Sequence, residues 1–188
     1  SCCDAEITTN RGGLRLVYSG SSQGWITATA GNNATARQAE FITATGGNTI
    51  LTCGNFKTHI FTADGNFVVS SAGNSDGSNS VEYLVVAGGA GGGDGSGSGG
   101  GGAGGFRTTY PSPTTAGLSV SAQTYPITVG AGGAFSCSPT TQGSAGSNTI
   151  FSTITSAGGG GGGSESSPVR AGVNGGSGGG GQGSGSPP

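Results

Sequence analysis

Residues 151–163 read FSTITSAGGGGGG, a run of apolar and hydroxyl side chains that ends in six consecutive glycines. The first half combines aromatic and β-branched residues, which favour a strand. The second half has no side chains. Each glycine loses about 1–2 kcal/mol of backbone entropy when it is ordered, so a single glycine tract cannot hold itself in place. The fold therefore depends on what surrounds these glycines.

The same order of strand and glycine tract occurs twice earlier in the chain, in VEYLVVAGGAGGG (81–93) and ITVGAGG (127–133). Extended helices with three residues per turn and no side chains can approach closely and hydrogen-bond through their backbones. Several such tracts side by side offset the entropy that one tract loses. We therefore expect packed polyglycine II helices, not free linkers. The longest glycine tracts are 88–105, 158–163 and 175–185.

Composition excludes several classes of protein. The chain has 45 glycines in 188 residues, 7% charged residues and a net charge of -2, a balance unlike that of charge-rich disordered segments. A strict Gly-X-Y period is absent and only 7 residues are proline, which excludes collagen. The near-neutral charge gives no basic surface for nucleic acid. No apolar run approaches the roughly 20 residues that cross a bilayer, so membrane insertion is not expected.

The sequence predicts an all-β fold of short antiparallel, sandwich-like modules with almost no α-helix. The best helix candidate, residues 34–40, is about two turns long. A hairpin is expected at Asp64-Gly65 and a second turn at Gln123-Thr124. The predicted strands cover residues 14–18, 24–28, 49–52, 57–62, 66–70, 81–86, 118–122, 125–129 and 149–155.

Two domains are expected. Residues 1–38 would form an N-terminal β segment containing Trp25, and residues 39–188 a glycine-rich β and polyglycine domain. The β part of the second domain would lie mainly in residues 49–87, 118–130 and 149–155.

The four cysteines, Cys2, Cys3, Cys53 and Cys137, allow three pairings if all are bridged. Adjacent cysteines do not easily bridge to each other. A metal site is the alternative, but no C-x-x-C motif or nearby histidine supports one. Buried free thiols are the third reading. We therefore expect disulfides or free thiols and no metal.

No catalytic or cofactor site is expected. Residues 95–100 (GSGSGG) match the dinucleotide pattern G-x-G-x-x-G, but no helix-forming sequence follows them to bind a pyrophosphate. His59, the single histidine, lies in a predicted strand and is read as a surface or interface residue. The eight acidic residues form no recognisable catalytic pair. Trp25 could stack on a sugar, but an anchoring role in the N-terminal segment is favoured.

Two segments interrupt the glycine with larger side chains: RTTYPSPTTAG (107–117) and SESSPVRAGVN (164–174). Exposed loops on a rigid scaffold often perform recognition, although a connecting role fits these segments equally well. They supply the candidate receptor contacts Arg107, Tyr110, Glu165 and Arg170.

The succession of VEYLVVAGGAGGG, GGGGAGGFR, SVSAQTYPITVGAGGA, GSNTIFSTITSAGGGGGG and NGGSGGGGQG resembles the glycine-rich domain of tail fibres and related virion proteins of tailed phages, particularly marine and cyanobacterial phages. The resemblance covers about residues 49–185. ITTNRGGLRLVYSGSSQGWITATAGN, earlier in the chain, is similar to a β segment that precedes this domain in those fibres. The chain stops at residues 183–188 (GSGSPP), whereas the family often continues, so a truncated distal part is expected. The start, which lacks an initiator Met, would be a processed end or that of a fragment.

The resemblance implies a homo-oligomeric fibre subunit in a virion, a homotrimer or a helical polymer. Its partners would be other virion proteins and a host cell-surface glycan or protein. The thin apolar core that 31% hydrophobic residues allow also favours self-association. The alternative is a self-assembling bacterial surface protein or secreted filament, which would polymerise through an open-ended interface. The third candidate is an ice-binding polyglycine bundle, against which the irregular interruptions of the glycine argue.

Overall fold

The computed structural model describes residues 15–18, 25–28, 39–109 and 117–183. The chain divides into two compact units. The smaller comprises Ser1–Phe41 and Gly73–Asn79, and the larger comprises Ile42–Ala72 and Ser80–Pro188. The predicted boundary after residue 38 remains a prediction.

In the smaller unit, β1 (Arg15–Tyr18) pairs with β2 (Trp25–Ala28) in an antiparallel hairpin, with Tyr18 opposite Trp25. A tight loop elsewhere in this unit is organised by Asn74. Its side-chain oxygen accepts hydrogen bonds from the backbone N–H groups of Glu40, Asp76 and Gly77. Of the helix candidate at 34–40, residues 34–38 lie outside the described residues and the last two are not helical.

The larger unit is built on a five-stranded antiparallel sheet in the order β13-β12-β11-β6-β3. Exposed and buried residues alternate over residues 66–70 of β6 and along β11, so one face of each strand is buried. The described residues contain no helix, which confirms the all-β prediction. The strands of this sheet are β3 (Ile42–Thr45), β6 (Gly65–Ala72), β11 (Thr124–Thr128), β12 (Thr149–Phe151) and β13 (Ile154–Ser156).

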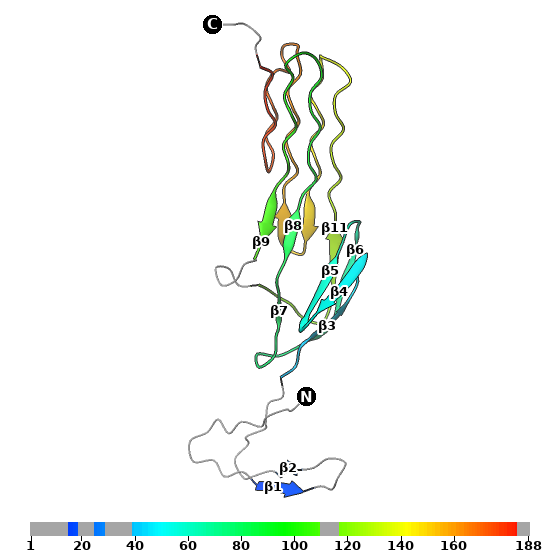
Figure 1. The fold of residues 1–188 in the computed structure, drawn as a ribbon, viewed down its shortest axis with the longest axis vertical. Helices are drawn as coiled ribbons and strands as arrows, with labels where there is room; N and C mark the ends of the chain where they lie inside the picture. Colours follow the sequence, from blue (N-terminus) through cyan, green and yellow to red (C-terminus); the bar gives the residue numbers. More distant parts are fainter. Residues whose placement is uncertain (1–14, 19–24, 29–38, 110–116, 184–188) are drawn as a thin grey trace, which may run out of the picture. The chain divides into compact units, whose positions relative to one another are not determined.

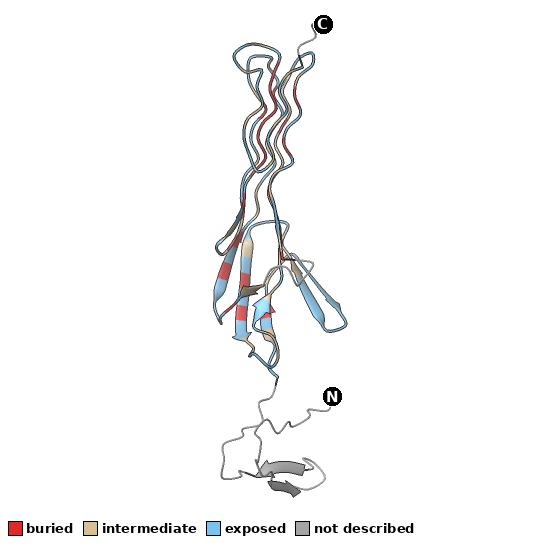
Figure 2. Cartoon of the chain, turned by 90° about the vertical axis from the view of Figure 1, so that its left-hand side faces the viewer, coloured by how far each residue is buried: buried red, intermediate tan, exposed pale blue. Residues whose placement is uncertain are grey.

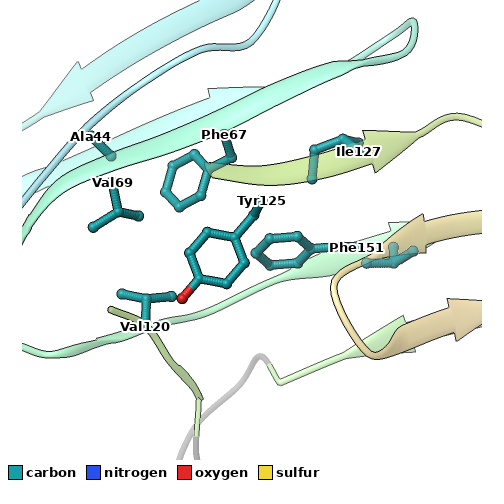
Figure 3. Close-up of a cluster of buried hydrophobic side chains, with 8 residues drawn as sticks. Ala44, Phe67, Val69, Val120, Tyr125, Ile127 and Phe151 are labelled. Carbon is teal, nitrogen blue, oxygen red and sulfur yellow. The ribbon is translucent and has the colours of Figure 1, made fainter. Parts of the chain in front are cut away.

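Aromatic side chains fill the buried face of the sheet (Figure 3). Phe151 is the centre of this cluster, because its ring lies 6.1 Å from Phe67, 6.2 Å from Tyr125 and 6.4 Å from Tyr83, all near edge-to-face. The Tyr125 hydroxyl accepts a hydrogen bond from the backbone N–H of Ser121. Bonding to Ser121, foremost to its side chain, lowers the pKa of this hydroxyl.

Short two-stranded sheets complete the larger unit and supply the second layer of the core. β7 (Ser80–Val81) pairs with β10 (Leu118–Ser119), and β8 (Leu84–Val86) pairs with β9 (Phe106–Thr108). Val85 of β8 and Val120, just after β10, belong to the same buried cluster as the sheet's aromatic residues. β4 (Thr49–Cys53) and β5 (Phe56–Ile60) form a separate hairpin.

The hairpin predicted at Asp64-Gly65 is wrong. β5 pairs with β4, and β6 pairs with β3 and β11 in a different sheet. The hairpin of β4 and β5 closes instead through the two-residue turn Gly54-Asn55, where Gly54 has φ +57°. The Asp64 carboxylate instead accepts a hydrogen bond from the backbone N–H of Val129, 2.7 Å away.

Other strand predictions also need correction. The turn at Gln123-Thr124 does not close a hairpin, because β10 pairs with β7, and β11 with β6 and β12. The strand predicted at 149–155 is the hairpin of β12 and β13, which turns at Ser152 with φ +55°. The strand predicted at 81–86 is divided between β7 and β8. β3 and β9 were not predicted.

Candidate functional site: the glycine bundle and its tip

The strands pass directly into the glycine tracts without losing their register (Figure 1). Thr149 of β12 lies opposite Ser156 of β13. Further along the same two chains, the N–H of Gly146 donates to the carbonyl of Gly159, and Gly143 donates to Gly162. Between β-strands the pattern repeats every two residues, whereas here it repeats every three, as in polyglycine II.

Hydrogen bonds of this kind hold seven tracts together among the described residues. They recur between tracts every three residues. Side chains add to them where a tract departs from pure glycine, as where the Ser177 hydroxyl of tract 7 donates to the carbonyl of Gly104 in tract 2, 2.9 Å away. We number the tracts along the chain: tract 1 (87–94), tract 2 (99–105), tract 3 (130–136), tract 4 (143–148), tract 5 (157–164), tract 6 (170–174) and tract 7 (176–183).

Tract 5 lies at the centre of the bundle and hydrogen-bonds to five other tracts. Its N–H groups donate to tracts 1 and 7, and its carbonyls accept from tracts 2, 4, 6 and 7. For example, the N–H groups of Gly159 and Gly162 donate to tract 1, and their carbonyls accept from tract 4. Tracts 1, 2 and 4 therefore each use residues of tract 5 that lie three apart.

Every residue of 158–164 is buried, a continuous stretch along the axis of the bundle (Figure 2). A side chain at any of the six glycines would meet a neighbouring carbonyl oxygen. A Cβ built at Gly160 would lie 1.8 Å from the oxygen of Val173, and one at Gly161 would lie 1.8 Å from that of Gly143. Six consecutive glycines are thus required because this tract has close neighbours on several sides.

The requirement is weaker at the surface of the bundle. A Cβ at Gly100 of tract 2 would meet nothing within 4 Å, and one at Gly132 of tract 3 would meet only the oxygen of Gly89, at 3.6 Å. Outer tracts also include larger residues, such as the exposed Phe135. The longest pure glycine run in the sequence is therefore the buried one.

Three loops gather at the end of the bundle farther from the strands: 95–98, 137–142 and 165–169 (Figure 1). Ser164, which is completely buried, links them. Its hydroxyl accepts a hydrogen bond from the N–H of Asp94, 2.8 Å away, and donates to the carbonyl of Thr141. The N–H of Ser166 donates to the carbonyl of Pro139. We call these three loops the tip.

Ser156, just before tract 5, and Ser164, at its other end, are both fully buried, so substitutions at these two positions can be compared directly. The Ser156 hydroxyl has no hydrogen-bond partner among the described residues, whereas that of Ser164 has two. We expect Ser164→Ala to cost about 1–3 kcal/mol of the free energy of unfolding, because it removes two hydrogen bonds, to the N–H of Asp94 and the carbonyl of Thr141, that contribute about 0.5–1.5 kcal/mol each. Ser156→Ala should be neutral or slightly stabilising. Denaturant unfolding measures both, and equal losses would contradict this assignment of the bonds.

The structure separates the candidate receptor contacts. Glu165 lies in a tip loop, and Arg170 is the first residue of tract 6, which follows that loop. Arg170 Nε donates to the backbone carbonyl of Glu165, and a Glu165 carboxylate oxygen accepts from the N–H of Ser96. Arg107 is exposed on β9, among the strands. Tyr110 lies outside the described residues. The tip loops at 95–98 and 137–142 were not identified from the sequence, although the latter contains the larger residues Pro139 and Gln142.

The structure also places the cysteines, the histidine and the dinucleotide-like motif that were singled out in the sequence. Cys53 and Cys137 are exposed free thiols, while Cys2 and Cys3 lie outside the described residues. His59 faces the five-stranded sheet, with its ring 5.2 Å from Phe67 and its Nδ1 2.7 Å from the carbonyl oxygen of Gly46. Residues 95–100, which match the dinucleotide motif, comprise the turn at 95–98, where Gly95 and Gly97 have positive φ, and the first two residues of tract 2.

Within the described ranges, no group of three His, Cys, Asp or Glu side chains could hold a metal ion. Nor does that part of the chain contain a helix that is long and apolar enough to cross a membrane.

A family model described as "Glycine-rich domain" matches residues 62–188, a range that includes all seven tracts and the tip. No curated protein matches the chain significantly. The same is true of solved structures.

Proposed function

The chain belongs to the glycine-rich domain family, and from this premise we propose that it is a non-enzymatic structural subunit of a phage fibre that contributes to host attachment. Its place would be the virion, as part of a tail or surface fibre. The phage assignment derives from the sequence resemblance described above. The role as a scaffold derives from the bundle.

The observation that supports this proposal best is the construction of the bundle. Five tracts, 1 to 5, connect the strands at one end with the tip at the other, and backbone hydrogen bonds join them along their length. The bundle contains few side chains that could line a cavity for a small molecule. The polar and charged side chains of the tip, such as Glu165, and the adjacent Arg170 are instead presented at the end of a stiff support, an arrangement suited to contact with another surface.

Exposed apolar side chains among the strands support self-association. Leu84, Val86 and Phe106 are 63%, 52% and 64% exposed. Val86 and Phe106 are paired across β8 and β9, and alternation along β8 places Leu84 and Val86 on the same face, opposite the buried Val85. Apolar side chains gathered on one exposed face are typical of subunit interfaces. They fit a homo-oligomeric fibre.

Electron microscopy of virions tests the proposal. Gold-labelled antibody against the chain should bind virion fibres of the phage that encodes it, and light scattering of the purified protein at micromolar concentration should show an oligomer. Label on long filaments free of virions would instead favour the bacterial surface filament. A stable folded monomer would contradict the homo-oligomer.

If the tip contacts the host, Glu165→Gln should weaken binding of the purified protein to host cells. The substitution removes a negative charge but keeps an oxygen that can accept from the N–H of Ser96, so the loop should retain its conformation. We expect a severalfold loss, because one ionic contact at a partly hydrated interface contributes roughly 1 kcal/mol. Binding of fluorescently labelled protein to cells measures this change.

Glu82→Gln is the matched control, since Glu82 is exposed between β7 and β8, away from the tip. It should bind as the parent protein does. Equal loss in both variants would indicate a general effect of charge and would contradict recognition by the tip.

A further inference from the structure

The backbone of each glycine tract is extended almost to the maximum length that its number of residues allows. A three-residue-per-turn helix of this type rises about 3.1 Å per residue, whereas a fully extended chain spans at most about 3.3–3.6 Å per residue. Each tract therefore already has about nine-tenths of its maximum length. An α-helix, with about 1.5 Å per residue, could more than double in length under load. We infer that the bundle is a tension-bearing element, which transmits a pull from the tip to the strands with almost no lengthening.

Covalent continuity supports this inference. Each of tracts 1 to 5 is joined at one end to a strand and at the other to a tip loop. The strands are β8, β9, β11, β12 and β13, three of which belong to the five-stranded sheet. A pull on the tip is thus shared among five chain segments that have little slack. It reaches the aromatic core through Phe151 of β12, which directly follows tract 4.

The hydrogen bonds between tracts determine how the load is divided. They join tract to tract across the bundle, so a pull along the bundle loads many of them together, in shear. Between tracts 5 and 2, for example, the carbonyls of Ala157, Gly160 and Gly163 each accept one of these bonds. A pull that separates two tip loops sideways instead loads the bonds nearest the tip first, such as the one from Ser136 to Gly92. The bundle should therefore be strong along its axis and weaker across it.

This inference rests on the proposed function only for the origin of the load, because a fibre attached to a cell is pulled along its length. It concerns a mechanical property of the chain, which can be measured whether or not the chain belongs to a virion. The tip and the strand end also offer exposed residues for attaching handles. Ser96 and Thr140 lie in tip loops, and Thr153 lies in the turn between β12 and β13.

Single-molecule force spectroscopy of the full chain tests the inference. Handles are attached through introduced cysteines in two pairs, Ser96→Cys with Thr153→Cys for an axial pull, and Ser96→Cys with Thr140→Cys for a sideways pull. Cys2, Cys3, Cys53 and Cys137 are replaced by serine in both. We expect the axial pair to rupture at a force severalfold higher than the sideways pair. Before rupture, the axial pair should lengthen by no more than about a tenth of the separation of its handles.

Equal rupture forces for the two pairs would overturn the inference, as would gradual lengthening of the axial pair at the force that opens the sideways pair. Circular dichroism and thermal unfolding of both variants confirm beforehand that they fold as the parent protein does. The outcome is independent of the virion labelling. If the antibody labels virion fibres but the two handle pairs rupture at equal forces, only the tension-bearing role is refuted. If the axial pair ruptures at the higher force but virions are not labelled, only the fibre assignment is refuted.

Discussion

Gly161→Ala should destabilise the protein by about 3 kcal/mol or more, because it introduces a methyl group where no space exists. The new Cβ would lie 1.8 Å from the oxygen of Gly143 and 2.7 Å from its carbonyl carbon. These are backbone atoms of tract 4, which cannot rotate away as a side chain could. Separating tracts 4 and 5 would also weaken the bonds from Gly143 and Gly146 to tract 5. Thermal unfolding should show a melting temperature lower by roughly 6–12 °C.

Gly100→Ala is the matched control, since both substitutions add one methyl group to a tract. A Cβ at Gly100 meets nothing within 4 Å, and its backbone does not have a positive φ. Replacing glycine where the backbone allows it stabilises a protein by about 0.4–1 kcal/mol, through the unfolded chain. If Gly161→Ala and Gly100→Ala behaved alike, the central position of tract 5 would be wrong.

Phe151→Ala should cost about 3–5 kcal/mol, the usual range for a buried phenylalanine. Phe151 is 8% exposed and contacts three other aromatic rings, so its loss leaves a cavity in the middle of the core. It also lies on the strand that continues tract 4, and the hairpin of tracts 4 and 5 should become less well anchored. Chemical denaturation, followed by tyrosine fluorescence, measures the loss.

The same substitution at Phe135 provides the control. Phe135 belongs to tract 3 and is 71% exposed, so Phe135→Ala removes little buried surface and should change the free energy of unfolding by less than about 0.5 kcal/mol. A comparable loss at both positions would show that Phe135 is buried, for example against another subunit. Measurement at several protein concentrations distinguishes that case, because subunit association makes stability depend on concentration.

The sequence identified the class of fold because its signals are local. FSTITSAGGGGGG contains β-branched residues followed by residues without side chains. The first half is β structure, although as a hairpin and not one strand, and the second half is a packed glycine tract as predicted. The glycine count indicated that tracts had to pack together. The sequence also indicates which tract is central, because residues 158–163 are the only six consecutive glycines in the chain.

Strand pairing could not be predicted in the same way, because it depends on contacts between distant residues. Asp64-Gly65 has the composition of a hairpin turn, yet Asp64 bonds to Val129 and the strands on either side join different sheets. Gly54-Asn55, a weaker signal, closes the hairpin. At Ser152 the turn has no glycine at all, so the run from Thr149 to Thr155 looked continuous.

The tip was only partly predictable. Glu165 and Arg170 were identified because they interrupt glycine, but Arg107 shares that feature and lies on a strand. Glu165 and Arg170 differ from Arg107 in lying where the chain turns at the end of the bundle far from the strands. The position of each turn depends on the number of residues in the tract before it. The turn at 95–98 was hidden inside residues 88–105, which look like one tract and form two.

Amide hydrogen exchange along tract 5 tests the central claim most directly, namely that the glycine tracts form an ordered, hydrogen-bonded bundle. The N–H groups of Gly159, Gly160, Gly162 and Gly163 donate to neighbouring tracts from buried positions, and they should exchange orders of magnitude more slowly than those of an unstructured chain. The exposed Gly100, whose N–H has no partner among the described residues, should exchange quickly in the same sample. Exchange of all five at the rate of an unstructured peptide would contradict the bundle.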